Sequence, residues 1–294
     1  MTPRRLCFCF DNNEISGSEL MSNTGMVSAE RVRRPWWQPD TIPLAIAIPL
    51  LLLLAGAIIG AFAQVQIEYP IMRFLNSFAD RSQLFDRSMH ALTKLVLLQG
   101  AVFIALVWYL WFTFPDIVTR SLLLAGTLGA ALAGVLSRVL QLLLPSHLRP
   151  LHTPQLGFVL PLDVDPRALN HFNSFPSDHG AVFFGLCAII YRVNPRLGIA
   201  AFAWAIVIDA ARVYEGYHFP SDIIGAAGIG ILLVQLSQGQ PVQRLASRCL
   251  MLERSFRPAF YTVAFLATYQ IASLFDDVRE LGIGLLHHGP LIGG

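Results

Sequence analysis

The chain has 294 residues, of which 54% are hydrophobic and only 14% are charged, and its mean hydropathy is +0.55. Soluble domains carry about 25% charged residues, and disordered chains have low hydrophobicity, so the composition excludes both classes. It indicates an integral membrane protein. The formal net charge of +2 is too small to favour a nucleic-acid partner.

The first part of the chain differs from the rest. Residues 1–35 are polar and show no hydrophobic periodicity, and Met26 opens a compact start of its own. We expect residues 1–35 to be a disordered or misannotated N-terminal extension. A membrane domain is expected over residues 36–240, followed by a C-terminal extension over residues 241–294.

Apolar runs with few or no charges predict six core transmembrane helices. The runs are residues 41–67, 95–115, 121–144, 180–191, 197–208 and 223–236. Stretches of about 20 apolar residues span a bilayer, although the last three runs are shorter. Each of these three adjoins a polar cluster, and Arg138 interrupts the third run. The sequence therefore predicts an all-α integral-membrane bundle that forms one unit.

Two segments allow more than one interpretation. The apolar residues of the segment 68–93 have near-helical spacing, which fits an amphipathic helix at the membrane interface, but a solvated loop fits equally well. Residues 259–275 are a possible seventh span that includes Thr268 and Gln270, so an interfacial helix is the alternative. The Lys and Arg bias places the N-terminus inside and the loops 145–178 and 212–222 on the outer face.

Three polar clusters adjoin the predicted spans, where ionisable groups are costly and usually functional. The first cluster contains Arg138 and Arg149, the second is Ser-Phe-Pro-Ser-Asp-His-Gly at residues 174–180, and the third occupies residues 212–222. Arg149 alone fits an interfacial arginine, and Arg138 alone fits a polar residue that faces the bundle interior. The predicted orientation places the second and third clusters, together with Arg149, on one face of the membrane.

These clusters contain the groups that phosphoryl transfer needs. Arginine guanidinium groups match phosphate oxygens, and Ser177 begins a helix whose N-terminus suits an anion, so capping and phosphate binding are compatible roles. His218 precedes Asp222 by four residues, so one helical turn would let the carboxylate orient the imidazole as a nucleophile. A second histidine, His179, is placed to act as a general acid.

A zinc site is the competing interpretation of five histidines in this region: His147, His152, His171, His179 and His218. No pair of them has tight metal-ligand spacing, so we expect no metal ion and no other cofactor. We interpret Tyr214 and Glu215 as surface or wall residues.

The motifs resemble those of the type 2 phosphatidic acid phosphatase family. The resemblance rests on Arg-Pro at residues 149–150, Pro-Ser-Asp-His at residues 176–179, and Arg212-x5-His218-x3-Asp222. It implies a bundle of six membrane helices, with His218 as nucleophile, Asp222 as its orienting partner and His179 as the acid that protonates the leaving group. It also implies that Arg149, Arg212 and Ser177 bind the substrate phosphate.

The sequence departs from that family at three positions. Leu142 stands where the family has Lys, Asp178 where it has Gly, and Ala211 where it has Ser. A carboxylate beside a phosphate site is unfavourable unless it points away or pairs with an arginine. Arg138, about one turn before Leu142, is a candidate replacement for the missing phosphate ligand.

The leading hypothesis is a metal-independent lipid phosphatase that works through a phosphohistidine. The resemblance suggests undecaprenyl diphosphate, phosphatidate or phosphatidylglycerol phosphate as substrate, in a bacterial inner membrane with the site facing the periplasm or exterior. The expected partners are the lipid phosphate and the bilayer, with no nucleic acid and no obligate protein partner. The alternatives are a lipid phosphotransferase with the same site and a non-catalytic phosphate- or lipid-binding membrane protein.

Overall fold

The computed structural model of the chain describes residues 42–145, 147–169 and 173–274, so the predicted extension at residues 1–35 and His171 lie outside it. All regular elements in the described ranges are helical, which confirms the predicted all-α class. The α-helices are α1 (Ile42–Phe62), α2 (Tyr69–Asn76), α3 (Gln83–Lys94), α4 (Val102–Thr113), α5 (Ile117–Leu143), α6 (Asp178–Val193), α7 (Pro195–Tyr214), α8 (Pro220–Ser237), α9 (Gln240–Ser255) and α10 (Arg257–Ala272). Short π-helical turns, Gln64–Glu68 and Leu97–Ala101, precede α2 and α4.

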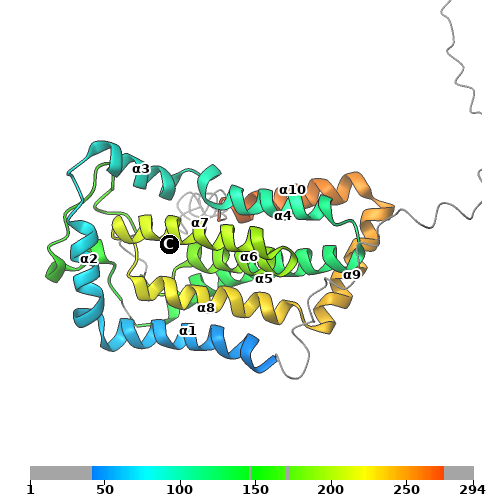
Figure 1. The fold of residues 1–294 in the computed structure, drawn as a ribbon, viewed down its shortest axis with the longest axis horizontal. Helices are drawn as coiled ribbons and strands as arrows, with labels where there is room; N and C mark the ends of the chain where they lie inside the picture. Colours follow the sequence, from blue (N-terminus) through cyan, green and yellow to red (C-terminus); the bar gives the residue numbers. More distant parts are fainter. Residues whose placement is uncertain (1–41, 146, 170–172, 275–294) are drawn as a thin grey trace, which may run out of the picture.

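Helices α5, α6 and α8 form the centre of the bundle, with α1 packed on α8 and α7 packed on α6 (Figure 1). Fully buried apolar side chains such as Phe103, Phe183 and Leu186 fill the main core. Helices α6 and α8 approach so closely that a Cβ added at Gly230 would lie 2.2 Å from the Ala181 carbonyl oxygen. Small residues allow such close packing where no hydrophobic effect drives membrane helices together.

Three described helices, α5, α7 and α8, are each long and apolar enough to cross a membrane. Two helix pairs qualify only when joined across a bend, Ile46–Phe62 with Gln64–Asn76 and Gln83–Lys94 with Leu97–Thr113. Helix α6 has 16 residues, about 24 Å at 1.5 Å per residue, which is shorter than the hydrocarbon core of a bilayer. The chain is an integral membrane protein, but the predicted count of six core spans is not confirmed.

The predicted first and second spans are bent rather than straight. The chain bends by 92° between α1 and the helical segment Gln64–Asn76, and by 68° between α3 and the helical segment Leu97–Thr113. Within the second segment, Gln99 has a non-helical conformation (φ −86°, ψ −106°). Residues 68–93 form α2 and α3 with a short turn between them, so the loop interpretation is wrong and the helical one is confirmed. The bend places α2 across the end of the bundle at the left of Figure 1.

Helix α10 confirms that the seventh candidate segment is helical, whereas α9 was not predicted. Helix α9 contacts α5 and crosses the opposite end of the bundle, and α10 lies against α4 (Figure 1). Hydrogen bonds from Trp108 to Thr268 and from Trp111 to Tyr261, each 3.2 Å, attach α10 to α4. The described part of the C-terminal segment therefore packs on the membrane bundle.

Candidate active site

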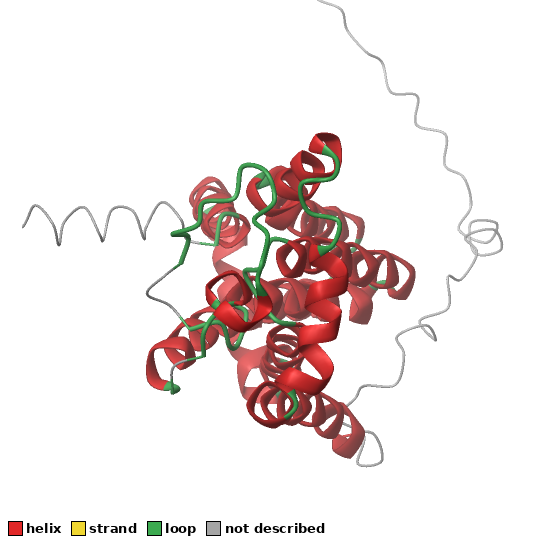
Figure 2. Ribbon diagram, turned by 90° about the vertical axis from the view of Figure 1, so that its left-hand side faces the viewer, coloured by secondary structure: helices red, strands yellow, loops and turns green. Residues whose placement is uncertain are grey.

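The three sequence clusters meet at the end of the bundle where α5 ends, α6 begins, α7 ends and α8 begins. Figure 2 views this end directly and shows that the long connections gather over it. Ser177 caps α6, since its Oγ accepts a hydrogen bond from the Gly180 amide at 3.2 Å. At the start of α8, Asp222 Oδ2 accepts a hydrogen bond from the Phe219 amide at 2.7 Å. These caps fix both helix starts beside the clustered side chains.

His218 is held by a backbone carbonyl as well as by a carboxylate. Its Nδ1 lies 3.0 Å from the Ser174 carbonyl oxygen and 3.4 Å from Asp222 Oδ2. His218 precedes α8 instead of sharing a helical turn with Asp222, so the predicted helical face does not form. Because a carbonyl only accepts hydrogen bonds, Nδ1 carries the proton and Nε2 keeps its lone pair.

Asp222 is oriented by neutral donors. The same carboxylate oxygen that faces His218 accepts hydrogen bonds from the Phe219 amide and the Ser174 hydroxyl. Burial lowers the pKa of His218, and its hydrogen bond with Asp222 opposes this shift. His218, only 1% exposed, is thus favoured in the neutral, nucleophilic form.

Arg149 faces the nucleophilic nitrogen of His218. Its Nη1 lies 3.5 Å from His218 Nε2 and donates to the Tyr217 carbonyl at 2.6 Å, while its Nη2 donates to the Asn173 carbonyl at 3.0 Å. Burial lowers the pKa of Arg149 to about 10, which leaves it charged at neutral pH. Its Nε is buried and has no hydrogen-bond partner among the described residues. A buried guanidinium with an unmet N–H is suited to an anion.

Arg212, in the last turn of α7, has the same character. It is 4% exposed, and its Nη2 donates to Gln99 Oε1 at 2.7 Å. Its Nε is also buried without a hydrogen-bond partner within the described part of the chain. Sequence analysis missed Gln99 because it lies inside an apolar run, where a single amide gives no signal of its distant partner.

The second motif forms a chain of contacts that includes its unusual carboxylate. Asp178 Oδ2 lies 2.5 Å from Arg138 Nη2, and Asp178 Oδ1 lies 2.9 Å from His179 Nδ1. Arg138 Nη1 also donates to Gln141 Oε1 at 3.0 Å. Arg138 is therefore engaged by α5 and α6 side chains, a geometry that does not favour its predicted role as a phosphate ligand. Leu142, at the family's lysine position, is 66% exposed.

The electrostatics place these groups near one another. Burial has the largest effect on the pKa of Arg149; Asp178 and Asp222 raise this pKa, whereas Arg138 and Arg212 lower it.

The connection between α5 and α6 contributes Asn173, a residue to which the sequence assigned no role. The Asn173 side chain joins it to the end of α5, donating to the carbonyls of Leu144 at 2.9 Å and Pro145 at 3.2 Å. The sequence showed the motifs but not these contacts, because the acceptors are backbone carbonyls, which every residue has.

Tyr214 and Glu215, interpreted as surface or wall residues, are buried at 3% and 0% exposure, so the surface alternative is wrong. Glu215 accepts a hydrogen bond from the Thr93 hydroxyl at 2.5 Å and lies 2.8 Å from His90 Nδ1. The Tyr214 hydroxyl donates to Asp86. These contacts attach α3 to the end of α7 and so brace the segment that precedes His218.

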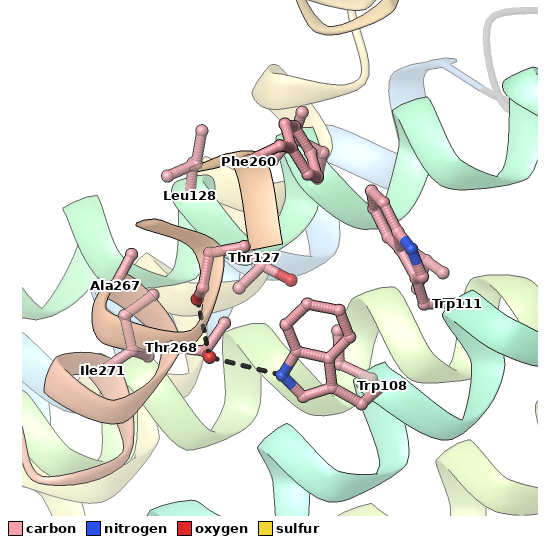
Figure 3. Close-up of a pocket in the computed structure, with 12 residues that line it drawn as sticks. Trp108, Trp111, Thr127, Leu128, Phe260, Ala267, Thr268 and Ile271 are labelled. Carbon is pink, nitrogen blue, oxygen red and sulfur yellow. Dashed lines mark hydrogen bonds between the residues drawn. The ribbon is translucent and has the colours of Figure 1, made fainter. Parts of the chain in front are cut away.

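A separate cavity of about 70 Å³ lies between α4, α5 and α10 (Figure 3), and none of the clustered ionisable groups lines it. Its walls include Trp108, Trp111 and Phe260, and no titratable side chain lines it. Within the residues that the structure describes, no group of three or more His, Cys, Asp or Glu side chains is arranged to hold a metal ion. The chemistry therefore concentrates at the loop-rich end.

The combined geometry suits attack on a phosphate. A neutral imidazole presents its Nε2 lone pair beside Arg149, Arg212 supplies a second buried cation, and the amide-rich start of α6 adjoins them. Such groups bind a phosphoryl dianion and stabilise the negative charge that develops during its transfer. His179 supplies a second titratable group in the same cluster.

Comparison with known proteins gives independent information. Residues 146–244 match the sequence profile of the PAP2 superfamily. The bacitracin transport permease protein BcrC of Bacillus licheniformis is 22% identical over 173 residues, covering 58% of this chain and 78% of the relative. The undecaprenyl-diphosphatase BcrC of Bacillus subtilis is 24% identical over 170 residues, covering 57% and 80%.

A solved structure is also similar. The transmembrane PAP2 type phosphatidylglycerolphosphate phosphatase from Bacillus subtilis matches with a TM-score of 0.48 and 22% identity, covering 67% of this chain and 95% of the other. The family resemblance predicted from the three motifs is confirmed by the profile match, which spans all three.

Proposed function

Residues 146–244 match the PAP2 superfamily profile, and from this match we propose that the chain is a metal-independent lipid phosphatase. The substrate is a lipid phosphate monoester or diphosphate, and the reaction passes through a phosphohistidine. The observation that carries the proposal is the position of His218 Nε2, 3.5 Å from Arg149 Nη1 in a buried cluster. There a phosphate held by Arg149 would meet the nucleophile directly.

The first step transfers the phosphoryl group to the protein. The lone pair of His218 Nε2 attacks phosphorus, a P–N bond forms, and the bond from phosphorus to the lipid oxygen breaks. Nδ1 keeps its proton, held by the Ser174 carbonyl and Asp222, which stabilise the positive charge that the ring acquires. Arg149 and Arg212 neutralise the equatorial oxygens. The departing lipid oxygen receives a proton from His179.

The second step returns His218 to its starting state. Neutral His179 removes a proton from water, whose oxygen attacks phosphorus, and the P–N bond breaks to release inorganic phosphate. His179 thereby regains the proton that it gave to the leaving group. Ser177 takes part by capping α6, which fixes the direction of the backbone amides beside the phosphate.

The proposed substrate class follows from the relatives' names and from the membrane setting. The Bacillus subtilis BcrC is named as an undecaprenyl-diphosphatase, and a lipid diphosphate places its phosphates at the membrane surface, where the helix ends of this chain form the site. Both of the BcrC relatives are bacterial. We propose a bacterial inner membrane with the site on the outer face, as the Lys and Arg bias favours.

Asp178 bears on the choice between an active and a decayed site. As an unpaired anion it would repel phosphate, but it lies 2.5 Å from Arg138, and the pair carries no net charge. This pairing removes the electrostatic objection and favours the enzyme over the non-catalytic binding protein. A phosphotransferase would use the same groups and differ only in its acceptor.

Phosphate release by the purified protein in detergent tests the proposal. Undecaprenyl diphosphate, phosphatidate and a water-soluble phosphomonoester are offered with a metal chelator present, to wild type and to the variants His218→Ala and His152→Ala. His152 is a matched control, because it is a histidine of the connection between α5 and α6 whose ring Nε2 lies 3.0 Å from the Ala168 carbonyl oxygen. We expect release by wild type and His152→Ala, and none by His218→Ala.

Each contrary result has a distinct meaning. Release that stops with the chelator would contradict the metal-independent route, and release retained by His218→Ala would contradict the nucleophile. Phosphate bound without turnover by folded wild type would favour the binding protein. Product that forms only with an added alcohol would identify the transferase.

A further inference from the structure

The carboxylate of Asp178 lies between His179, the acid of the proposed reaction, and Arg138. Asp178, the first residue of α6, is 8% exposed. Its Oδ1 accepts a hydrogen bond from the His179 amide at 3.0 Å and lies 2.9 Å from His179 Nδ1. Its Oδ2 accepts from Arg138 Nη2 at 2.5 Å. Each carboxylate oxygen therefore has a defined partner.

The pair is anchored from a neighbouring helix. Arg138 lies on α5 and also donates to Gln141 Oε1 at 3.0 Å. Gln141, one turn later on α5, donates from Nε2 to the Pro176 carbonyl at 2.6 Å. One side chain of α5 thus holds the first residue of α6 and another holds the segment directly before it, which limits the freedom of the Asp178 carboxylate.

The His179 ring is fixed on a second side. It stands nearly perpendicular to the Phe183 ring, with centroids 6.0 Å apart and an interplanar angle of 84°. Because Asp178 engages Nδ1, Nε2 is the ring nitrogen left to exchange a proton with a bound substrate. The contact thereby selects both the orientation and the reactive nitrogen.

We propose that Asp178, held by Arg138, is a positioning residue that maintains His179 as the acid of the reaction. The inference rests on the proposed function. Burial lowers the pKa of His179 to about 3, and the charge and hydrogen bond of Asp178 oppose this shift. The carboxylate thereby stabilises the imidazolium before proton transfer and the Nδ1–H tautomer after it. The proton moves from Nε2 to the leaving oxygen as the phosphorus–oxygen bond breaks, and Nδ1 keeps its proton throughout. Arg138 prevents the carboxylate from adding net negative charge beside the phosphate.

A purely structural ion pair between α5 and α6 is the competing explanation, and leaving-group dependence separates the two. An acid is needed to expel a basic alkoxide, whereas p-nitrophenolate leaves readily without one. Loss of acid assistance therefore lowers kcat/KM for an alkyl phosphate much more than for an aryl phosphate. A structural defect lowers both alike.

The test compares short-chain phosphatidate with p-nitrophenyl phosphate in wild type, Asp178→Asn and His179→Ala. The matched control is Glu253→Gln, which removes another ion pair of α5, between Arg120 Nη1 and Glu253 Oε1 at 3.1 Å, far from the site. We expect Asp178→Asn to lower kcat/KM for phosphatidate by roughly 10²-fold and for p-nitrophenyl phosphate by less than about threefold. Glu253→Gln should leave both values near wild type.

The kcat/KM of the double variant Asp178→Asn/His179→Ala tests whether the two residues act together. If Asp178 acts through His179, the double variant is no slower than His179→Ala alone. Equal losses with both substrates, no loss with either, or additive losses in the double variant would overturn the inference. Thermal unfolding of each variant confirms that it is folded.

A spectroscopic measurement keeps the inference testable even if wild type hydrolyses none of the substrates. In ¹⁵N-histidine-labelled wild type, with the His179 signals assigned through His179→Gln, we expect a protonated Nδ1. An unprotonated Nδ1 in the neutral ring would overturn the role of Asp178. Loss of turnover in wild type with a protonated Nδ1 would instead count against the proposed function alone.

Discussion

The two histidines of the site are held in contrasting ways. His218 is 1% exposed, and its Nδ1 meets the Ser174 carbonyl and a carboxylate that neutral donors orient. His179 keeps 17% of its side chain exposed, and its Nδ1 meets the carboxylate of Asp178, which a cation orients. Burial lowers the pKa of both rings, that of His179 to about 3, and Asp178 and Asp222 each oppose this shift at the histidine that they contact.

The difference fits a division of labour between nucleophile and acid. A nucleophile needs a neutral ring with an available lone pair, whereas an acid needs a protonated ring that regains its proton after each reaction. Asp178, paired with Arg138, supplies the negative charge that favours the imidazolium of His179.

Loss of the nucleophile should have the largest effect. We expect His218→Ala to lower kcat by at least about 10³-fold with every substrate, because no other group can form the P–N bond. Initial rates of phosphate release measure it, with thermal unfolding to confirm the fold. A rate within tenfold of wild type would show that the two histidines are assigned wrongly.

Loss of the acid should be large but selective. We expect His179→Ala to lower kcat/KM for an alkyl phosphate by roughly 10²- to 10⁴-fold, and for an aryl phosphate much less, because only the alkoxide needs a proton to leave. The ratio of the two kcat/KM values is the measured quantity. An unchanged ratio would remove the contrast between the histidines.

Removal of a neutral donor should have a smaller effect. Ser174→Ala deletes the hydroxyl that donates to Asp222 but keeps the carbonyl that accepts from His218. We expect kcat to fall by about tenfold, the kinetic equivalent of one buried hydrogen bond to a charged group. The same loss should occur with alkyl and aryl phosphates, because the nucleophile is affected and the acid is not. A substrate-selective loss would contradict this assignment.

The smallest change lies in the pH profile. Burial lowers the pKa of His218, so the neutral nucleophile persists below the ordinary histidine pKa of about 6.5. The midpoint of the acid limb in the pH profile of kcat/KM should therefore lie below pH 6.5, about the ordinary histidine pKa. Activity is lost as the pH drops through the lowered pKa of His218. Rates across buffers of constant ionic strength measure the limb. A limb at or above 6.5 would show that burial does not govern His218.

The helices were predictable because apolar runs are local signals, and α4 to α8 all follow them. The bends were not, because distant contacts accompany them. Glu68, in the turn after α1, accepts from the Ser221 amide at 2.8 Å, and Gln99 accepts from Arg212. Both partners are more than 100 residues away in sequence, so no local pattern in residues 41–67 or 95–115 reveals them.

The site was predictable at the level of motifs but not of contacts. Sequence spacing identified His218, Asp222 and His179 as a group, and the structure places them at one end of the bundle. The Ser174 carbonyl had no signal, because every residue carries one. The pairing of Arg138 with Asp178 joins residues 40 positions apart. The sequence allowed Asp178 to pair with an arginine but did not identify which one, and it made Arg138 a candidate phosphate ligand instead.

Trapping the phosphorylated protein tests the central claim most directly. In His179→Ala supplied with p-nitrophenyl phosphate, the phosphoryl group should reach His218 without an acid, and its hydrolysis should be slow because the base is missing. Alkaline quenching and peptide mass spectrometry should then locate a base-stable, acid-labile phosphate on His218. Its absence, or a phosphate on another residue while nitrophenolate is still released, would contradict the account.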